Sequence, residues 1–267
     1  MWDKRAVWAL AFVIGVPLHA AAQGSKKIQD NSFLVEEAYN QEAGVVQHIQ
    51  SAMYNQKTKD WFYTFTQEWP VPDETHQLSY TIPLTRLANP GTTGVGDIAL
   101  NYRYQAILKE HVAFSPRLSI ILPTGDYKKG LGAGSAGLQT NLPLSLELSE
   151  KFVSHFNLGA TYTQGNKEPG GAKANTLGTN YGASLIYLAT ENFNLMLEAV
   201  RSTTELVQPD GSKQPDTTTF INPGVRFAQN YASGLQIVSG LSFPLGIGSS
   251  SGTKGVLLYL SFEHPFK

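Results

Sequence analysis

Apolar and polar residues alternate along most of this chain with a period of two. Between positions 138 and 148, the even positions hold five leucines and a threonine. The odd positions hold polar residues and one proline: Gln139, Asn141, Pro143, Ser145 and Glu147. The segment from 112 to 122 repeats this pattern, and a glycine-rich stretch joins the two. A period of two is typical of a strand with one buried and one polar face, so the pair predicts a β-hairpin.

The same alternation recurs at regular intervals and predicts an all-β fold. With the hairpin segments 112–122 and 138–148, it indicates twelve strands, the others lying near 45–54, 61–69, 77–85, 97–105, 152–163, 180–187, 193–198, 221–227, 235–243 and 258–263.

The lengths of the expected connections also alternate. Short links are expected near 71–74, 107–111, 149–151, 190–192 and 229–233. Longer links are expected near 88–94, 124–136, 164–175, 204–217 and 246–253. Bacterial outer-membrane barrels combine an even number of antiparallel strands with short periplasmic turns and longer extracellular loops. A β-sandwich has no reason to place every long loop at one end. Residues 42–267 are therefore expected to form a closed antiparallel transmembrane up-and-down β-barrel of about 12 strands.

The first residues have the pattern of a secretory signal peptide. Lys4 and Arg5 precede an apolar run from 6 to 18, which is followed by the small residues 20–22. The run is shorter than the roughly 20 residues that a membrane helix needs. We expect residues 1–22 to be a signal peptide, cleaved after Ala22, and the mature chain to reach the Gram-negative outer membrane.

Two tryptophans fit an aromatic girdle. Trp61 and Trp69 share one face of a strand and lie eight residues apart. The separation is roughly 26 Å along the strand and about 20 Å along the membrane normal after tilting. Each indole is therefore expected at one membrane interface, where aromatic side chains are enriched. The alternative is two ordinary packed aromatic residues.

Five prolines interrupt the expected strands. A proline removes a donor from the hydrogen-bond ladder, and a closed barrel has no free edge to accommodate the loss. Bulges or strand ends are expected at these positions, which are Pro83, Pro116, Pro143, Pro223 and Pro244.

Composition excludes several classes of function. The formal net charge is −1 and no basic stripe is present, which argues against a nucleic-acid partner. There is no cysteine, and the histidines show no metal-ligand spacing, so neither a metal nor a cofactor is expected. The glycine-rich stretch 130–134 precedes no helix and is better explained as a flexible loop than as a phosphate cradle. Ser154 and His155 are adjacent, so they point to opposite faces of a strand and do not suggest a lipid-modifying hydrolase.

Polar-face positions hold a set of charges that would point into a barrel lumen. A barrel of twelve strands leaves room for a constriction, and charges in a narrow lumen are expected to pair with one another. The candidate lumen-lining residues are Glu68, Asp97, Arg103, Arg117, Glu147, His155, Glu198, Arg226 and Glu263. A salt-bridged filling without any role in transport remains the alternative.

Three stretches resemble a known family. They are NSFLVEEAYNQEAGVVQHIQ at 31–50, GVGDIALNYRYQ at 94–105 and LPTGDYKKGLGAGSAGLQTNLP at 122–143. They are similar to the bacterial outer-membrane β-barrel family associated with the phenol meta-cleavage (MetA) degradation pathway. The resemblance covers most of the mature chain and implies transport of small, often aromatic or hydrophobic molecules. It also implies outer-membrane lipid as surroundings and assembly by the barrel-assembly machinery through the C-terminal strand, near Phe266.

The segment before the first strand does not alternate. Residues 23–41 are expected to form a periplasmic tail or a plug that enters the barrel mouth. Asn31 or Ser32 is a candidate cap for a short helical turn. The candidate plug residues are three apolar and aromatic side chains and two acids that would reach Arg103 or Arg117, namely Phe33, Leu34, Tyr39, Glu36 and Glu37.

The sequence leaves two classes of function open. One is a channel or transporter for small molecules, and the other is a structural barrel or a lipid-modifying enzyme. Conductance across a bilayer separates the first from the second, and phospholipid release would identify an enzyme.

Overall fold

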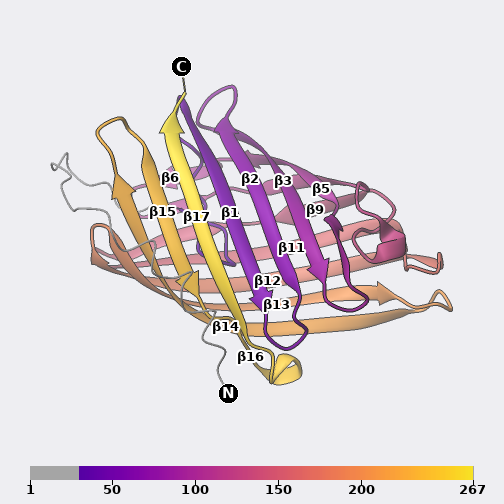
Figure 1. Ribbon diagram of the computed structural model, residues 1–267. Helices are drawn as coiled ribbons and strands as arrows, with labels where there is room; N and C mark the ends of the chain where they lie inside the picture. Colours follow the sequence, from indigo (N-terminus) through magenta and orange to yellow (C-terminus); the bar gives the residue numbers. More distant parts are fainter. Residues whose placement is uncertain (1–29, 267) are drawn as a thin grey trace.

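The computed structural model describes residues 30–266, which form one closed antiparallel sheet. The predicted signal peptide, residues 1–22, lies outside the described residues. Between residues 45 and 265 the chain runs from one end of the barrel to the other twelve times, and each of these passes is called a crossing. The first strand, β1 (Val45–Asn55), pairs over its whole length with the last, β17 (Gly255–Pro265), and this pairing closes the sheet (Figure 1). The predicted barrel of about 12 strands is confirmed.

Eight crossings are single strands and four are interrupted. Besides β1 and β17, the single strands are β2 (Trp61–Pro70), β3 (His76–Leu87), β11 (Phe152–Lys167), β12 (Lys173–Thr190), β13 (Phe193–Val207) and β14 (Lys213–Asn230). The interrupted crossings combine β4 (Thr92–Val95), β5 (Ile98–Tyr104) and β6 (Ile107–Lys109); β7 (Val112–Phe114) and β8 (Arg117–Leu122); β9 (Gly137–Asn141) and β10 (Leu144–Ser149); and β15 (Gln236–Ser242) and β16 (Leu245–Gly246). Two short 3₁₀ turns, η2 (Tyr127–Lys129) and η3 (Gly248–Ser250), lie in connections.

The prolines account for the interruptions. Pro116, Pro143 and Pro244 each lie between the two strands of a broken crossing. Pro83 and Pro223 lie within β3 and β14, but each faces a break in the neighbouring crossing, where its carbonyl still accepts a hydrogen bond from that crossing. The expected strand ends therefore occur at Pro116, Pro143 and Pro244, because proline donates nothing to the ladder. At Pro83 and Pro223 the expectation is wrong, since the strand continues and the break lies in the neighbouring crossing.

The two ends of the barrel differ. One end, here called the terminal rim, holds the start of β1, the end of β17 and the links 71–75, 110–111, 150–151, 191–192 and 231–235. The other end, the loop rim, holds the links 56–60, 88–91, 123–136, 168–172, 208–212 and 247–254. The prediction of longer links near 164–175 and 204–217 is wrong, because the links that form there are only 168–172 and 208–212. The strands β11 to β14 continue through these residues and form two long hairpins that project from the barrel (Figure 1).

The outer surface of the wall is apolar. Leu158, Leu197 and Leu258 are between 49% and 58% exposed, although they lie within regular strands. Trp61 contacts Tyr54 with ring centroids 4.7 Å apart, and Trp69 contacts Tyr80 edge-on at 6.1 Å. Within residues 30–266, no helix is long and apolar enough to cross a membrane. Burial is therefore inverted relative to a soluble protein, with polar side chains inside and leucines outside.

Candidate functional site

Residues 30–41 of the segment 30–44 lie inside the barrel, whereas residues 42–44 are exposed. The segment passes through the lumen and leads into β1 at Val45. Both ends of its path meet one side chain, because Gln47 contacts Asp30 at 3.0 Å and Gln41 at 2.5 Å. The helical turn considered for this segment does not form, since residues 30–44 contain bends and turns without any helix. A backbone without regular structure must find its hydrogen-bond partners elsewhere.

Wall side chains supply these partners. The Glu198 carboxylate accepts from the backbone N–H groups of Leu34 and Val35 at 2.9 and 3.1 Å. The Asn157 amide accepts from the Glu36 N–H and donates to the Glu36 carbonyl, both at 2.8 Å. Ser145 accepts from the Ala38 N–H at 2.8 Å. The lumen therefore holds the backbone of the segment in place of a helix or a sheet.

An apolar cluster on one side of the lumen seats Phe33. The ring packs in a buried cluster with side chains from β1, β12, β13, β14, β15 and β17, namely Ile49, Ile186, Met196, Ala228, Val238, Leu257 and Tyr259. It lies over Gly224 and Gly240, where an added Cβ would occupy the space of the ring. These glycines make room for the segment, which is why neither position carries a side chain.

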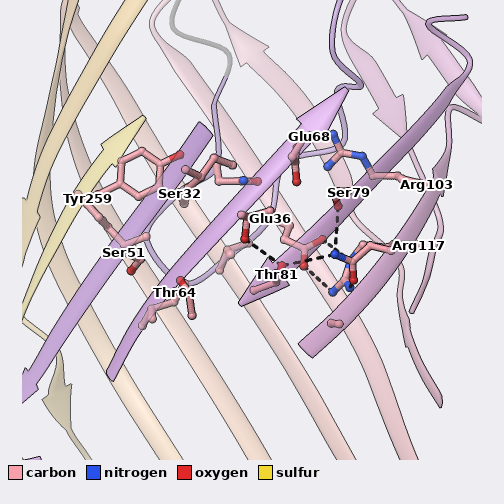
Figure 2. A pocket seen from close by; sticks show the side chains of 18 of the residues that line it. Ser32, Glu36, Ser51, Thr64, Glu68, Ser79, Thr81, Arg103, Arg117 and Tyr259 are labelled. Carbon is pink, nitrogen blue, oxygen red and sulfur yellow. Dashed lines mark hydrogen bonds and ion pairs between the residues drawn. The ribbon is translucent and has the colours of Figure 1, made fainter. Parts of the chain in front are cut away.

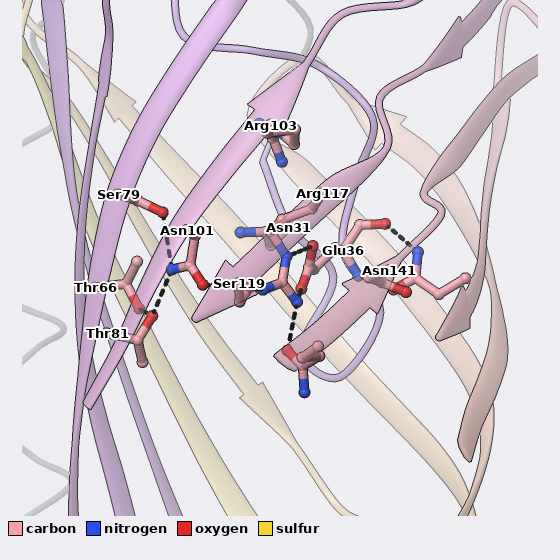
Figure 3. Close-up of polar contacts among 12 residues, drawn as sticks. Asn31, Glu36, Thr66, Ser79, Thr81, Asn101, Arg103, Arg117, Ser119 and Asn141 are labelled. Carbon is pink, nitrogen blue, oxygen red and sulfur yellow. Dashed lines mark hydrogen bonds and ion pairs between the residues drawn. The ribbon is translucent and has the colours of Figure 1, made fainter. Parts of the chain in front are cut away.

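The opposite side of the lumen carries Arg103 and Arg117. Arg117 on β8 donates hydrogen bonds to both carboxylate oxygens of Glu36, with Nε–Oε2 at 3.0 Å and Nη2–Oε1 at 2.6 Å (Figure 3). The same guanidinium donates to Asn101 at 3.0 Å, to Gln139 at 3.1 Å and to Ser119. Burial raises the pKa of the Glu36 carboxyl, but Arg117, Arg103 and Asn141 together lower it by more, so this pKa lies below its ordinary value.

Arg103 holds the backbone of the segment rather than a carboxylate. It donates to the carbonyl oxygens of Glu37 and Tyr39 and, at 3.0 Å, to the side chain of Asn40. Arg226, which is 2% exposed, plays the same part on β14 and donates to the carbonyls of Asp30 and Asn31 at 2.8 and 2.9 Å. Both arginines therefore anchor the segment to the wall.

Two acids of the segment are fully enclosed. Asp30 accepts from Tyr259 at 2.5 Å and from Ser261 at 2.7 Å, both on β17. Glu37 is 3% exposed, and its Oε2 atom is buried without a hydrogen-bond partner. Burial and the nearby Asp30 carboxylate raise the pKa of Glu37 well above its ordinary value. A neutral Glu37 suits this environment better than a charged one.

A cavity of about 300 Å³ remains between the segment and the wall. The segment forms one side through residues 31–36, and the other side is a wall of hydroxyl groups with two arginines and an acid (Figure 2). We call this side the hydroxyl wall, and it comprises Ser51, Thr64, Thr66, Ser79, Thr81, Glu68, Arg103 and Arg117. Hydroxyls donate and accept, so the hydroxyl wall can bind polar groups of either kind.

The remaining predicted residues lie as follows. Glu68 accepts from Gln77 at 2.7 Å beside the cavity. Asp97 accepts from the backbone of Gly125 and Ala133, at 2.9 and 2.7 Å, and so fixes the link 123–136. Glu147 lies 3.7 Å from His111 near the terminal rim. Glu263 on β17 acts electrostatically on Glu37. Leu34 is 37% exposed and lines the cavity, whereas Tyr39 does not.

The sequence did not indicate one buried pair of side chains in the lumen wall. His155 contacts Ser145 at 2.7 Å on the neighbouring strand, instead of Ser154. Both members of this pair are buried, at 2% and 0% exposure, beneath Ala38. Both residues stand at polar positions of the alternating pattern, which predicted that they point inward. Nothing in the sequence predicted that they are neighbours. Within residues 30–266, no group of three or more His, Cys, Asp or Glu residues is arranged to hold a metal ion.

Comparison with solved structures places the fold among outer-membrane channels. The COG4313 outer membrane channel from Pseudomonas putida F1 is 18% identical, with a TM-score of 0.62, and the match covers 86% of this chain and 98% of that chain. NanC porin is 6% identical, with a TM-score of 0.55 and coverage of 82% and 100%. KdgM porin is 6% identical, with a TM-score of 0.50 and coverage of 83% and 99%. At these identities, the likeness concerns the fold.

Comparison with protein families is more specific. No curated protein sequence matches the chain significantly. The profile of one family, described as "Putative MetA-pathway of phenol degradation", matches residues 27–262. This match spans the lumen segment and almost the entire barrel, in agreement with the resemblance of the three sequence stretches. The chain therefore belongs to the family described as the MetA pathway of phenol degradation.

Proposed function

We propose that this chain is an outer-membrane channel through which small molecules pass between its N-terminal segment and the hydroxyl wall. The observation that carries the proposal is the cavity of about 300 Å³ inside a closed barrel with an apolar outer face. The family and the folds of the similar outer-membrane channels support it. In this proposal the protein transports without catalysis, and its partners are membrane lipid and a small-molecule substrate.

The substrate class follows from the lining. The hydroxyl wall offers donors and acceptors but little apolar surface, while Phe33 and Leu34 add apolar contacts from the segment side. A small aromatic molecule with a polar substituent fits both sides, and the phenol-degradation description of the family agrees with this class. A cavity of this volume is at the lower end of the range of ligand pockets, about 300–1,000 Å³, which favours small solutes.

The orientation and route to the membrane are part of the proposal. We place the terminal rim in the periplasm, because barrels of this kind have short periplasmic turns and longer outer connections. Residues 1–22 would direct export, and β17 would present Phe266 to the barrel-assembly machinery. The segment 23–41 would then act as a plug that enters from the periplasmic side and narrows the pore.

Deletion of residues 24–41 tests the channel and the plug together. We expect the deletion protein, with its signal retained, to assemble and to show a larger single-channel conductance in planar bilayers than the full chain. Assembly is checked by the gel mobility of unheated against boiled protein, because a closed barrel has no free edge and resists the detergent until it is heated. If both proteins assemble and neither conducts, the barrel is structural. Equal conductance would reject the plug, and phospholipid release would indicate an enzyme.

A further inference from the structure

We propose that Arg117 is a binding site for small organic carboxylates, and that the site is held in this structure by the plug's own Glu36. A carboxylate ligand in the cavity would replace Glu36 on the guanidinium and weaken the hold of the wall on the plug. This inference rests on the proposed channel, because it assigns a substrate class and a means of opening to the same lumen.

The contact itself has the geometry of ligand recognition. Two nearly parallel hydrogen bonds, of 3.0 and 2.6 Å, join one edge of the guanidinium to the two oxygens of Glu36. A planar fork of this kind matches any carboxylate, whether it belongs to the protein or to a ligand. The plug therefore presents to Arg117 the chemical group that a free carboxylate would present.

The fork does not depend on Glu36 for its orientation. The guanidinium also donates to Asn101 on β5, Ser119 on β8 and Gln139 on β9 (Figure 3). These three side chains belong to the barrel wall, so they stay in place when the plug moves. A receptor group that is already held in its binding geometry loses little entropy when a ligand arrives.

The ion pair is accessible from the cavity. The side chains of Glu36 and Arg117 are 30% and 15% exposed, and both line the cavity together with Asn101 and Gln139. A ligand can therefore approach the fork while the plug is still seated.

The charge balance favours an anion in place of Glu36. Arg103 and Arg117 face the cavity together with Glu68 and Glu36. When Glu36 turns away, two guanidinium groups and one acid remain, and an incoming carboxylate restores the balance that burial of charge requires. A neutral molecule of the same shape cannot do so.

Loss of this pair would loosen the plug without freeing it at once. Asn157 still holds the backbone of Glu36, and Glu198 still holds Leu34 and Val35. The ion pair is nevertheless the anchor that holds the plug to Arg117 of the hydroxyl wall. A bound carboxylate therefore shifts the plug toward its released state by competing for one of its anchors.

Fluorine NMR of fluorobenzoate with the purified full-length mature barrel in micelles tests the site. We expect fluorobenzoate to bind and the neutral fluorobenzamide to bind weakly or not at all. Glu36→Gln removes the internal competitor and should tighten fluorobenzoate binding at least about tenfold. Arg117→Lys keeps the charge but loses the fork, and should abolish the binding. Glu205→Gln is the matched control, since it removes an ion pair to Lys213, at 2.8 Å, on a projecting hairpin.

The outcomes separate this inference from the proposed channel. Equal affinity in the wild type and Glu36→Gln, retained binding in Arg117→Lys, or equal binding of the amide would overturn the carboxylate site. Glu36→Ala serves the same comparison if Glu36→Gln does not assemble. In bilayers, fluorobenzoate should raise the conductance of the wild type toward that of the 24–41 deletion. Binding in the expected order without any conductance would reject the channel and keep the site.

Discussion

The ring of Phe33 meets the ring of Tyr259 edge to face, with centroids 6.3 Å apart and an interplanar angle of 86°. This contact joins the plug to the last strand of the barrel, within the apolar cluster that surrounds Phe33. Aromatic pairs of this geometry contribute about 0.5–1.5 kcal/mol beyond the burial of their surface. The ring can take this position only because Gly224 and Gly240 have no side chains. A substitution that fills the space over either glycine tests whether the ring is seated there.

Gly240→Ala should unseat the plug. The added Cβ would lie 2.5 Å from a Phe33 ring carbon, so the ring must move away from Tyr259. We expect faster hydrogen exchange at the Leu34 and Val35 amides and a larger conductance. Gly178→Ala is the matched control, because its Cβ would have its nearest neighbour 3.5 Å away. Wild-type exchange in Gly240→Ala would contradict the seat described for Phe33.

The seating of the plug should depend on pH through its two glutamates. The pKa of Glu37 is raised, so its contribution is full at low pH and is lost as pH rises through that raised value. The pKa of Glu36 is lowered, so its contribution is present above the ordinary value of 4.5 and is lost as pH falls below it. The plug is therefore most firmly seated near the shared ordinary value of 4.5, and its hold weakens through Glu36 on the acid side and through Glu37 on the alkaline side.

Glu37→Gln should weaken the alkaline limit and leave the acid limit unchanged. A neutral amide cannot acquire charge beside Asp30 and Glu263, although it keeps the neighbours Arg103 and Arg226. Conductance of the wild type should rise toward alkaline pH, and the rise should be smaller in Glu37→Gln, where Asp30, whose pKa burial also raises, still titrates. Glu36→Gln is the complementary control, since it should lose the acid limit and retain the alkaline one. A parallel alkaline rise in Glu37→Gln would show that another group is responsible.

Leu197→Arg should destabilise the barrel where Leu206→Arg does not. Leu197 is 49% exposed at a lipid-facing position of β13, and an arginine near the middle of the bilayer costs about 2–4 kcal/mol. Leu206 is 47% exposed on the same strand, within the hairpin that projects beyond the barrel. Urea unfolding in lipid vesicles measures both. Equal losses would mean that the projecting hairpin also lies in the membrane.

The sequence predicted the barrel because the membrane imposes a simple rule. Each crossing must be apolar outside and polar inside, so alternation marks the twelve crossings directly. It failed at 164–175 and 204–217, where adjacent polar residues, such as Asn166 with Lys167 and Thr204 with Glu205, occupy both faces of the strands. These residues lie beyond the apolar band, both faces meet water, and the pattern disappears although the hydrogen-bond ladder continues.

The lumen was only partly predictable. The alternation of polar and apolar positions identified the inward charges. It was also expected that Glu36 or Glu37 would reach Arg103 or Arg117, and Glu36 pairs with Arg117. The conformation of the plug was not predictable, because its backbone partners are distant along the chain: Glu198 lies 164 residues from Leu34, and Asn157 lies 121 residues from Glu36. Local propensity favoured a helical turn, and these long-range hydrogen bonds outweigh it. The space left by Gly224 and Gly240 is likewise visible only once the strands are assembled.

The bonds of Asp30 to Tyr259 and Ser261 join residues 229 and 231 positions apart. Contacts between such distant residues form late in folding, because the chain between them must be ordered first. The carboxylate of Asp30 therefore lacks its two hydroxyl partners until the final strand has been added and the seam between β1 and β17 has closed. A newly inserted barrel would pass through an open stage, and the plug would seat as the concluding step of its maturation.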